Sequence, residues 1–264
     1  MTLPLPDPNQ SARNGRPPAK LSAVEKVVRV VAALTDHRGV SEISRATDIP
    51  TSSVHRIVSE LVELGWARVD GGRGYLPGAA LMALAGWASS RSGFPVIARP
   101  ILEKLRDATT HTIHLGLRMG DVAVYVDKLD GFRSYAMRSR VGLAVPMHST
   151  AIGKAILASM PESEMLALLD RTGLPPVTPY TITDAETLIG ELQTAARVGY
   201  ALDKEENEVH TQCVAAAVRD FSGVPIGALS VSGMAFDLDD RGIRKIAPMV
   251  AEAARTLSKM LGHS

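Results

Sequence analysis

Three short helical patterns followed by a glycine-rich hairpin, all within residues 21–77, constrain the fold more than any other feature of this sequence. In the first pattern, apolar residues recur every three or four positions through residues 21–34, which is typical of an amphipathic helix. A second short helix is expected to start with Ser41 as its N-cap. It ends before Pro50, because the residue that precedes a proline is driven out of helical geometry.

The third helical pattern occupies residues 51–65 and ends at a glycine, which is common just after the last turn of a helix. Residues 66–76 then read as a small hairpin around the glycine-rich turn at 71–74. Three short helices and a hairpin in this order are the outline of a winged helix-turn-helix domain.

The third helix separates apolar and polar residues on its two sides. At about 100° per residue, Val54, Ile57, Val58 and Leu61 share one side. The opposite side carries hydroxyls, an imidazole and a guanidinium, and we count Glu63 as its only acid. The residues expected to contact DNA are Thr51, Ser52, Ser53, His55, Arg56 and Ser59, together with Arg68 and Arg73 of the hairpin.

These side chains suit double-stranded DNA. An arginine can form two hydrogen bonds to a guanine edge in the major groove, and serine or threonine can bond bases or phosphates. The exposed N–H groups at the start of the helix add donors for a phosphate. The alternative is a three-helix bundle whose polar face is merely solvated, and the two-arginine hairpin favours DNA binding over it.

Charge is distributed unevenly along the chain. With 264 residues, of which 45% are apolar and 22% charged, the composition is that of a globular protein. Residues 1–92 hold 11 Lys and Arg against 8 Asp and Glu, a net charge of +3. Residues 93–264 hold 18 against 20, a net charge of −2. The positive charge therefore lies in the part that contains the hairpin.

The length predicts two domains, at roughly 100–200 residues for each. We expect a disordered Pro-rich leader at 1–20, a winged helix-turn-helix domain at 21–77, a linker helix at 78–92 and a second domain at 93–264. In the second domain we predict strands at 111–119, 122–126, 214–218 and 225–231, and helices at 151–160, 162–170, 184–197 and 239–261. Two antiparallel strands, then helices, then two more antiparallel strands predict an α+β fold.

Several polar residues of the second domain have two interpretations. The helix that opens at 149–154 can attract an anion to its exposed N–H groups, or it can be a capped helix packed through small residues. Cys213, at the end of a polar loop and just before an apolar strand, is a buried small side chain or a reactive thiol. Ser230 and Ser232 share one face of their strand, where they line a polar pocket or face solvent.

The single cysteine excludes an internal disulfide framework and a cysteine-rich zinc site. Nothing enforces a metal-ligand geometry on Asp203, His210 and Cys213, so we expect neither metal nor cofactor. No apolar run approaches the ~18–20 residues needed to span a bilayer, and the Pro-rich start is unlike a secretory signal. These features predict a soluble, cytoplasmic protein without a membrane partner.

From about residue 21 to its last helix, the chain resembles the IclR-type bacterial transcriptional regulators. The motifs that carry the resemblance are TSSVHRIVSELVELGWARV, YLPGAALMALA, PMHSTAIGKAILASM and GYALDKEENEVHTQCVAAAVRDFSGVPIGALSVSG. The resemblance implies a winged-helix DNA-binding domain joined by a helical linker to a GAF-like effector domain. It also implies dimers or dimers of dimers on pseudopalindromic operators, and a response to small metabolites, often carboxylates or aromatic compounds.

The resemblance further implies where an effector binds. By position, the family's pocket corresponds to Ala151, Ile152, Asp203, Cys213, Ser230 and Ser232, with Met137, in a strand before the pocket, as part of an apolar wall. Backbone N–H groups and serine hydroxyls would receive a carboxylate, while Asp203 would accept from a ligand hydroxyl or orient a neighbour. Ile152 is bulkier than the small residue that some members place there, which argues against transferring a two- or three-carbon keto acid.

Three functional hypotheses follow. The first is a ligand-responsive DNA-binding regulator without enzymatic activity, in which effector binding shifts operator affinity through the linker helix. The second is the same regulator with Cys213 as a redox sensor. The third is a thiol-dependent enzyme with Cys213 as nucleophile and His210 or His148 as base, for which no oxyanion arrangement is recognisable.

Overall fold

A computed structural model describes residues 21–34, 36–84, 93–132 and 137–263. The chain divides into two compact units, Met1–Ser92 and Gly93–Ser264. The predicted leader at 1–20 and residues 85–92 of the predicted linker lie outside the described residues, and residues 79–84 of that linker are helical. None of the described helices is long and apolar enough to cross a membrane.

The N-terminal unit contains the predicted three helices and hairpin. These are α1 (Ala23–Ala33), α2 (Val40–Thr47), α3 (Thr51–Glu63), β1 (Ala67–Val69) and β2 (Tyr75–Pro77). Ser22 and Glu25 cap the start of α1 reciprocally, since each side chain accepts the other residue's N–H. The three helices and β1 enclose one apolar core, built from Val30, Ala33, Leu34, Ile43, Ile49, Val54, Ile57, Val58, Leu61 and Ala67.

The prediction that Ser41 caps α2 is wrong. The helix starts at Val40 with Gly39 as its N-cap, so Ser41 lies inside the first turn. The carboxylate of Glu42 takes the capping role, because its Oε2 accepts from the N–H groups of Gly39 at 3.1 Å and Arg38 at 3.2 Å. These two backbone hydrogen bonds lower the pKa of Glu42, and they make a hydroxyl cap unnecessary.

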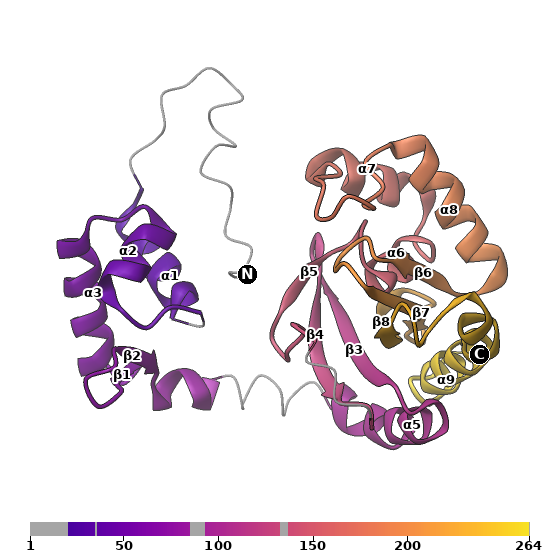
Figure 1. The fold of residues 1–264 in the computed structure, drawn as a ribbon, viewed down its shortest axis with the longest axis horizontal. Helices are drawn as coiled ribbons and strands as arrows, with labels where there is room; N and C mark the ends of the chain where they lie inside the picture. The colour runs from indigo at the N-terminus through magenta and orange to yellow at the C-terminus, as the bar shows by residue number, and fades with distance from the viewer. Residues whose placement is uncertain (1–20, 35, 85–92, 133–136, 264) are drawn as a thin grey trace. The chain divides into compact units, whose positions relative to one another are not determined.

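The C-terminal unit is built on one antiparallel sheet of order β5-β4-β3-β8-β7-β6 (Figure 1). Its strands are β3 (Thr112–Met119), β4 (Val122–Leu129), β5 (Ala144–Pro146), β6 (Ala201–Lys204), β7 (Thr211–Arg219) and β8 (Pro225–Met234). The four longer strands were predicted, but β5 and β6 were missed. Both are short edge strands, which contain too few residues to show an alternating pattern.

Helices cover both faces of the sheet. They are α5 (Phe94–Thr109), α6 (Ala151–Leu157), α7 (Glu162–Thr172), α8 (Ala185–Val198) and α9 (Asp240–Met260). α5 and α9 pack with Leu115, Val214 and Val231 on one face. α6, α7 and α8 enclose a second core on the other face. These layers confirm the predicted α+β fold, although α6 ends at Leu157, three residues before its predicted end.

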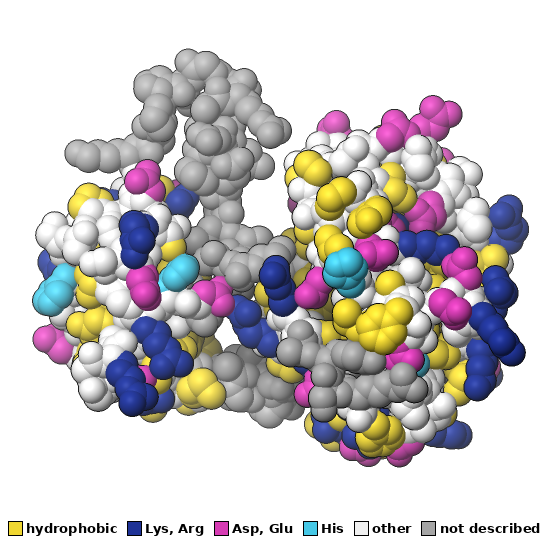
Figure 2. All heavy atoms as spheres, viewed as in Figure 1, with side chains coloured by type: hydrophobic (Ala, Val, Ile, Leu, Met, Phe, Trp, Pro, Cys, Tyr) yellow, Lys and Arg dark blue, Asp and Glu magenta, His cyan; other side chains and the backbone are white. Residues whose placement is uncertain are grey.

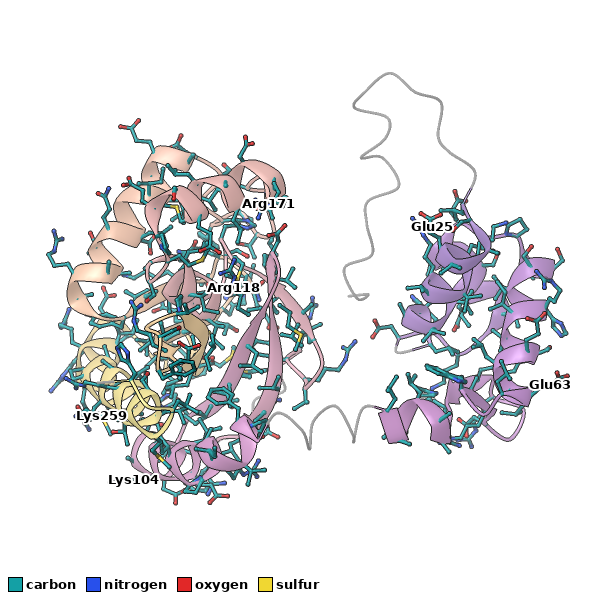
Figure 3. All side chains as sticks on the ribbon, turned by 180° about the vertical axis from the view of Figure 1, so that it is seen from behind. Glu25, Glu63, Lys104, Arg118, Arg171 and Lys259 are labelled. Carbon is teal, nitrogen blue, oxygen red and sulfur yellow. The ribbon has the colours of Figure 1, made fainter. Side chains whose placement is uncertain are left out.

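Two ion pairs attach α7 to the β3–β4 hairpin. Arg118 of β3 contacts Glu164 at 2.8 Å, and Arg171 of α7 contacts Asp121 at 2.7 Å. Figure 3 shows Arg118 and Arg171 on the side of the unit where α7 lies over the strands. All four groups are at least partly exposed, so each pair contributes little to stability, about 0–1 kcal/mol.

Candidate functional site

The outer side of α3 is exposed as the sequence predicted. Its apolar side chains Val54, Ile57, Val58 and Leu61 are buried in the core of the N-terminal unit. The polar residues turn away from that core: Thr51, Ser52, His55 and Arg56 are exposed, and Ser53 and Ser59 are half-buried. This helix therefore presents hydroxyls, an imidazole and a guanidinium to solvent.

The prediction that Glu63 is the only acid on the outer side of α3 is wrong. Glu60 as well as Glu63 is exposed, and Arg56 Nη1 lies 2.9 Å from Glu60 Oε1; Figure 3 marks Glu63 at the outer side of α3. The four-residue spacing of Arg56 and Glu60 is the sequence signal that was overlooked, because residues at that spacing are neighbours on a helix. This ion pair occupies Nη1 of Arg56 and therefore competes with a contact of the guanidinium to a base.

The hairpin that follows α3 is anchored by Arg38. The Arg38 carbonyl accepts the N–H of Tyr75 at 2.9 Å, and its guanidinium contacts Asp70 at 3.1 Å. Gly74, at φ +118°, passes so close to the Arg38 carbonyl that a Cβ atom would collide with it. Arg38 is exposed, so it adds a guanidinium to those of Arg68 and Arg73. Sequence reasoning did not single it out.

These cations form one group on the surface. Figure 2 shows Lys and Arg side chains gathered at the end of the N-terminal unit that carries the hairpin. The exposed residues Arg38, Arg68 and Arg73 belong to this end of the unit. Such a local basic face suits the phosphates of a nucleic acid, even though the whole chain has a net charge of only +1.

In the C-terminal unit, strand pairing brings the predicted polar residues together on one face of the sheet. Asp203 lies opposite Cys213, and Cys213 lies opposite Ser232. Ser230 and Ser232 are 2% and 3% exposed, so the interpretation in which they face solvent is wrong. The intervening Val231 packs in the core on the opposite face. Cys213 is the third residue of β7 and does not precede the strand.

His114 joins this polar face, although sequence reasoning did not assign it to the site. Its Nδ1 is 3.3 Å from Ser232 Oγ, and its Nε2 is 2.8 Å from Ser139 Oγ. The ring also lies against Tyr125, with 4.8 Å between the two centroids. Burial lowers the pKa of His114 to about 3, so the imidazole is neutral and offers one donor and one acceptor.

Asp203 is a buried carboxyl group whose pKa is raised. Burial and the neighbouring Glu206 carboxylate raise the pKa of Asp203 to about 7, against the opposing effect of hydrogen bonds from backbone N–H groups. Its Oδ1 accepts from the N–H of Glu206 at 2.8 Å. The group therefore changes between neutral and charged forms near neutral pH, on the same face of the sheet as the serine hydroxyls.

A buried lysine, which the sequence analysis did not identify, pairs with Glu206, the residue whose N–H donates to Asp203. Lys154 of α6 has a side chain that is 1% exposed, and its Nζ lies 2.5 Å from Glu206 and 3.2 Å from Glu191. Burial raises the pKa of Glu206, while the Lys154 ammonium opposes that rise. The available signal was a single lysine within the otherwise apolar segment Ala151–Leu157.

The start of α6 is capped by its own chain. Thr150 Oγ1 accepts the N–H of Gly153 at 3.0 Å, and Gly153 packs closely on the backbone of Met147. Ala151 and Ile152 are both 2% exposed. The side chain of Ile152 lies over Gly116 of β3, where a Cβ atom would crowd it. These contacts are those of the packed, capped helix that the sequence allowed as one interpretation.

Met137 was predicted to lie in a strand, but it does not. It is partly exposed in irregular chain between β4 and β5, and β5 begins only at Ala144. Because no strand of the described residues pairs with it, no ladder fixes the direction of its side chain.

The two histidines considered as bases for the Cys213 thiol each have another partner. His210 is 77% exposed beside Glu205, and His148 bonds the Pro175 carbonyl at 3.0 Å. Burial raises the pKa of Cys213 well above its usual value, and the Asp203 carboxylate adds to this rise. Among the described residues, no group of three His, Cys, Asp or Glu side chains could hold a metal ion.

Comparison with known proteins matches both units. The family described as "Bacterial transcriptional regulator IclR C-terminal" matches residues 90–259, and the IclR helix-turn-helix domain matches residues 23–71. The HTH-type transcriptional regulator KdgR of Dickeya chrysanthemi is 31% identical over 249 residues, which cover 93% of this chain and 82% of KdgR.

Solved structures agree with the sequence matches. The IclR protein of Thermotoga maritima has a TM-score of 0.74 and 32% identity, over 91% of this chain and 98% of its own. An IclR homolog from Microbacterium hydrocarbonoxydans, complexed with 4-hydroxybenzoate, has a TM-score of 0.74 and 27% identity, over 91% of this chain and 99% of its own. This chain therefore belongs to the IclR family and is a DNA-binding transcriptional regulator with a ligand-binding C-terminal domain.

Proposed function

We propose that the chain binds a pseudopalindromic operator as a homodimer or a dimer of dimers. In each copy, α3 enters the major groove and the β1–β2 hairpin contacts the flanking backbone. Arg56 and the hydroxyls of α3 read bases, while Arg68 and Arg73 contact phosphates. The observation that supports this proposal is the polar outer side of α3, with Ser52, His55 and Arg56 exposed, which is followed directly by a hairpin with exposed arginines.

We propose a small carboxylate, and in particular an aromatic acid, as the effector. The pocket consists of Met137, Ala151, Ile152, Asp203, Cys213, Ser230 and Ser232, to which we add His114. Ser230, Ser232 and neutral His114 supply hydrogen-bond donors for a carboxylate, and the Tyr125 ring supplies an apolar surface for an aromatic body. The 4-hydroxybenzoate bound by the Microbacterium homolog supports this chemical class.

The remaining assignments follow from this role. We propose the domain limits 1–20, 21–77, 78–92 and 93–264, as leader, DNA-binding domain, linker and effector domain. Residues 78–92 would transmit the effector's influence between the two domains. The regulator acts in the cytoplasm, has no enzymatic activity and needs no cofactor.

The central test measures operator affinity with and without small acids. If an effector binds one arrangement of the dimer about 10–100-fold better than another, the free energy of operator binding changes by up to roughly 1.4–2.7 kcal/mol. Fluorescence anisotropy with DNA from the regulator's own upstream region would measure this change across a panel of benzoates and aliphatic acids. The Ser230→Ala/Ser232→Ala chain is the control, and it should bind DNA without responding. Unchanged affinity across the whole panel would contradict effector control.

We expect the affinity for a benzoate-type effector to fall as pH rises from 6 to 8. Below about pH 7, Asp203 is neutral and tolerates a ligand carboxylate, whereas above pH 7 its own negative charge repels the ligand. The affinity should then drop by up to about tenfold per pH unit. Calorimetric titrations of the native chain and of Asp203→Asn, which stays neutral, would measure this. A pH dependence that survives in Asp203→Asn would assign the effect to another group.

We expect Cys213 to react slowly in the folded chain, because a raised pKa leaves little thiolate at neutral pH. Alkylation by iodoacetamide, followed by mass spectrometry, should be much slower in the folded chain than in the chain unfolded in urea. Mild peroxide should leave DNA affinity unchanged. Equal alkylation rates in both states would revive the redox hypothesis.

A further inference from the structure

The C-terminal unit contains a cavity that shares no residue with the proposed effector pocket. It has a volume of about 500 Å³ and lies where the end of α6, the end of α8 and the middle of α9 meet the edge of β7. We propose that this cleft binds an aliphatic monocarboxylate of medium chain length, that is, a fatty acid. A cavity of this size is within the usual range for small-molecule sites, about 300–1,000 Å³.

Small side chains make up most of the lining of the cleft. Eight alanines line it: Ala155, Ala158, Ala195, Ala196, Ala216, Ala217, Ala251 and Ala254. Tyr200 is the only aromatic ring besides the imidazole of His263 among the described lining residues. Small side chains on two helices leave room for a narrow body and contact it through methyl groups. This surface fits an alkyl chain better than a flat ring.

The cleft lies beside the part of β7 that has no paired strand on its β6 side. β6 pairs with β7 only as far as Ala201 opposite Ala215, so no strand accompanies Ala217 on that side. The Thr211 carbonyl accepts the N–H of Glu205 on the β6 side, and backbone groups two residues apart along a strand point the same way. The N–H and carbonyl of Ala217 therefore point toward the cleft, where the N–H can donate to a ligand oxygen.

The two arginines that line the cleft favour an anion. Arg219, Arg255 and His263 line it, and no Asp or Glu is among the described lining residues. Arg219 is held in place, since its Nη1 donates to the carbonyls of Ser159 at 3.2 Å and Gly223 at 2.8 Å. Arg255 lies on α9, where it pairs with the exposed Glu252. A carboxylate head can meet these guanidinium groups while its alkyl chain lies along the alanines.

Alanine methyl groups make the proposal directly testable by NMR. Octanoate is added to the full-length chain labelled at its alanine methyls. We expect shifts at Ala196, Ala217 and Ala251 and none at Ala151, which belongs to the other pocket. Octanol, which has the same chain without the charge, should bind at least about tenfold more weakly. Shifts confined to Ala151, or none at saturating octanoate, would overturn the proposal.

Two variants, each with a matched control, test separately whether binding needs the charge of Arg255 and the open volume of the cleft. Arg255→Gln should weaken octanoate binding about fivefold to tenfold, whereas Arg244→Gln, on α9 but away from the cleft, should not change it. Ala196→Phe should fill the cleft and abolish binding, whereas Gln193→Phe, on the exposed side of α8, should not. The proposal fails if each variant equals its control. Broadening of the same methyls with protein concentration alone would identify a second copy as the occupant and also overturn it.

Discussion

Replacing Lys154 by methionine is expected to lower the free energy of unfolding by about 3–5 kcal/mol. The variant keeps the length and most of the packing of the side chain but removes the ammonium group. Glu206, which is 4% exposed and 2.5 Å from that group, would be left as a buried carboxylate without its cation. Urea denaturation of the full-length chain, followed by far-ultraviolet circular dichroism, measures the loss.

The loss should depend on pH in a defined direction. Without Lys154, the pKa of Glu206, already raised by burial, rises further in the folded state. A carboxyl whose folded pKa lies above its unfolded value stabilises the protonated folded state at low pH. That stability is lost as pH rises from about 4 through the folded pKa. The deficit of Lys154→Met should therefore be larger at pH 8 than at pH 5.

Two further chains control for other causes. Lys204→Met breaks the exposed pair of Lys204 with Asp240, at 3.0 Å, and should cost less than about 1 kcal/mol. The double replacement Lys154→Met/Glu206→Leu removes both charges and should recover most of the loss, since apolar pairs often replace buried ion pairs without cost. Equal stabilities of Lys154→Met and Lys204→Met would show that the buried pair contributes nothing.

The polarity of α3 and the fold class could be predicted because they depend on local patterns. The apolar spacing of Val54, Ile57, Val58 and Leu61 determines which side of that helix is buried, and therefore which side is available. Likewise, the period of two along β8 placed Ser230 and Ser232 on one face, opposite Val231. Where a period of two or 3.6 continues for several residues, sequence alone indicates the direction of each side chain.

The interactions that could not be predicted join residues far apart in the chain. Lys154 meets Glu206 across 52 positions and Glu191 across 37. His114 reaches Ser232 across 118. No local pattern determines such pairs, because they depend on the order of strands in the sheet and on which helix covers which face. The resemblance implied that Asp203 and Cys213 share one pocket. It did not indicate that Lys154 and His114 belong to the surroundings of that pocket.

Short elements set the other limit of prediction. β5 and β6 contain three and four residues, and Met137 lies outside any strand. At the start of α2, the residue type of Ser41 indicated a hydroxyl cap, whereas the Glu42 carboxylate takes that role because it reaches two backbone N–H groups. Where two local arrangements have similar free energies, the three-dimensional geometry decides which one forms, and the sequence pattern does not show that geometry.

Operator binding is expected to be steeply salt-dependent, and two arginines should affect it in different ways. A protein that makes 6–10 phosphate contacts loses about 10³–10⁵ in affinity between 50 and 200 mM salt. Arg73, exposed at the tip of the hairpin, should contact phosphate. Arg73→Ala would then weaken all sequences alike and make the salt dependence less steep.

Arg56→Ala should instead change which sequence is bound. If Arg56 leaves Glu60, 2.9 Å away, to bond a guanine edge, its loss costs about 1–3 kcal/mol on the operator and little on unrelated DNA. Glu60→Gln, which weakens the competing ion pair, should raise operator affinity modestly. Anisotropy titrations of both arginine variants on operator and scrambled DNA, at several salt concentrations, separate the two roles. Identical sequence profiles for Arg56→Ala and Arg73→Ala would contradict this division between base and phosphate contacts.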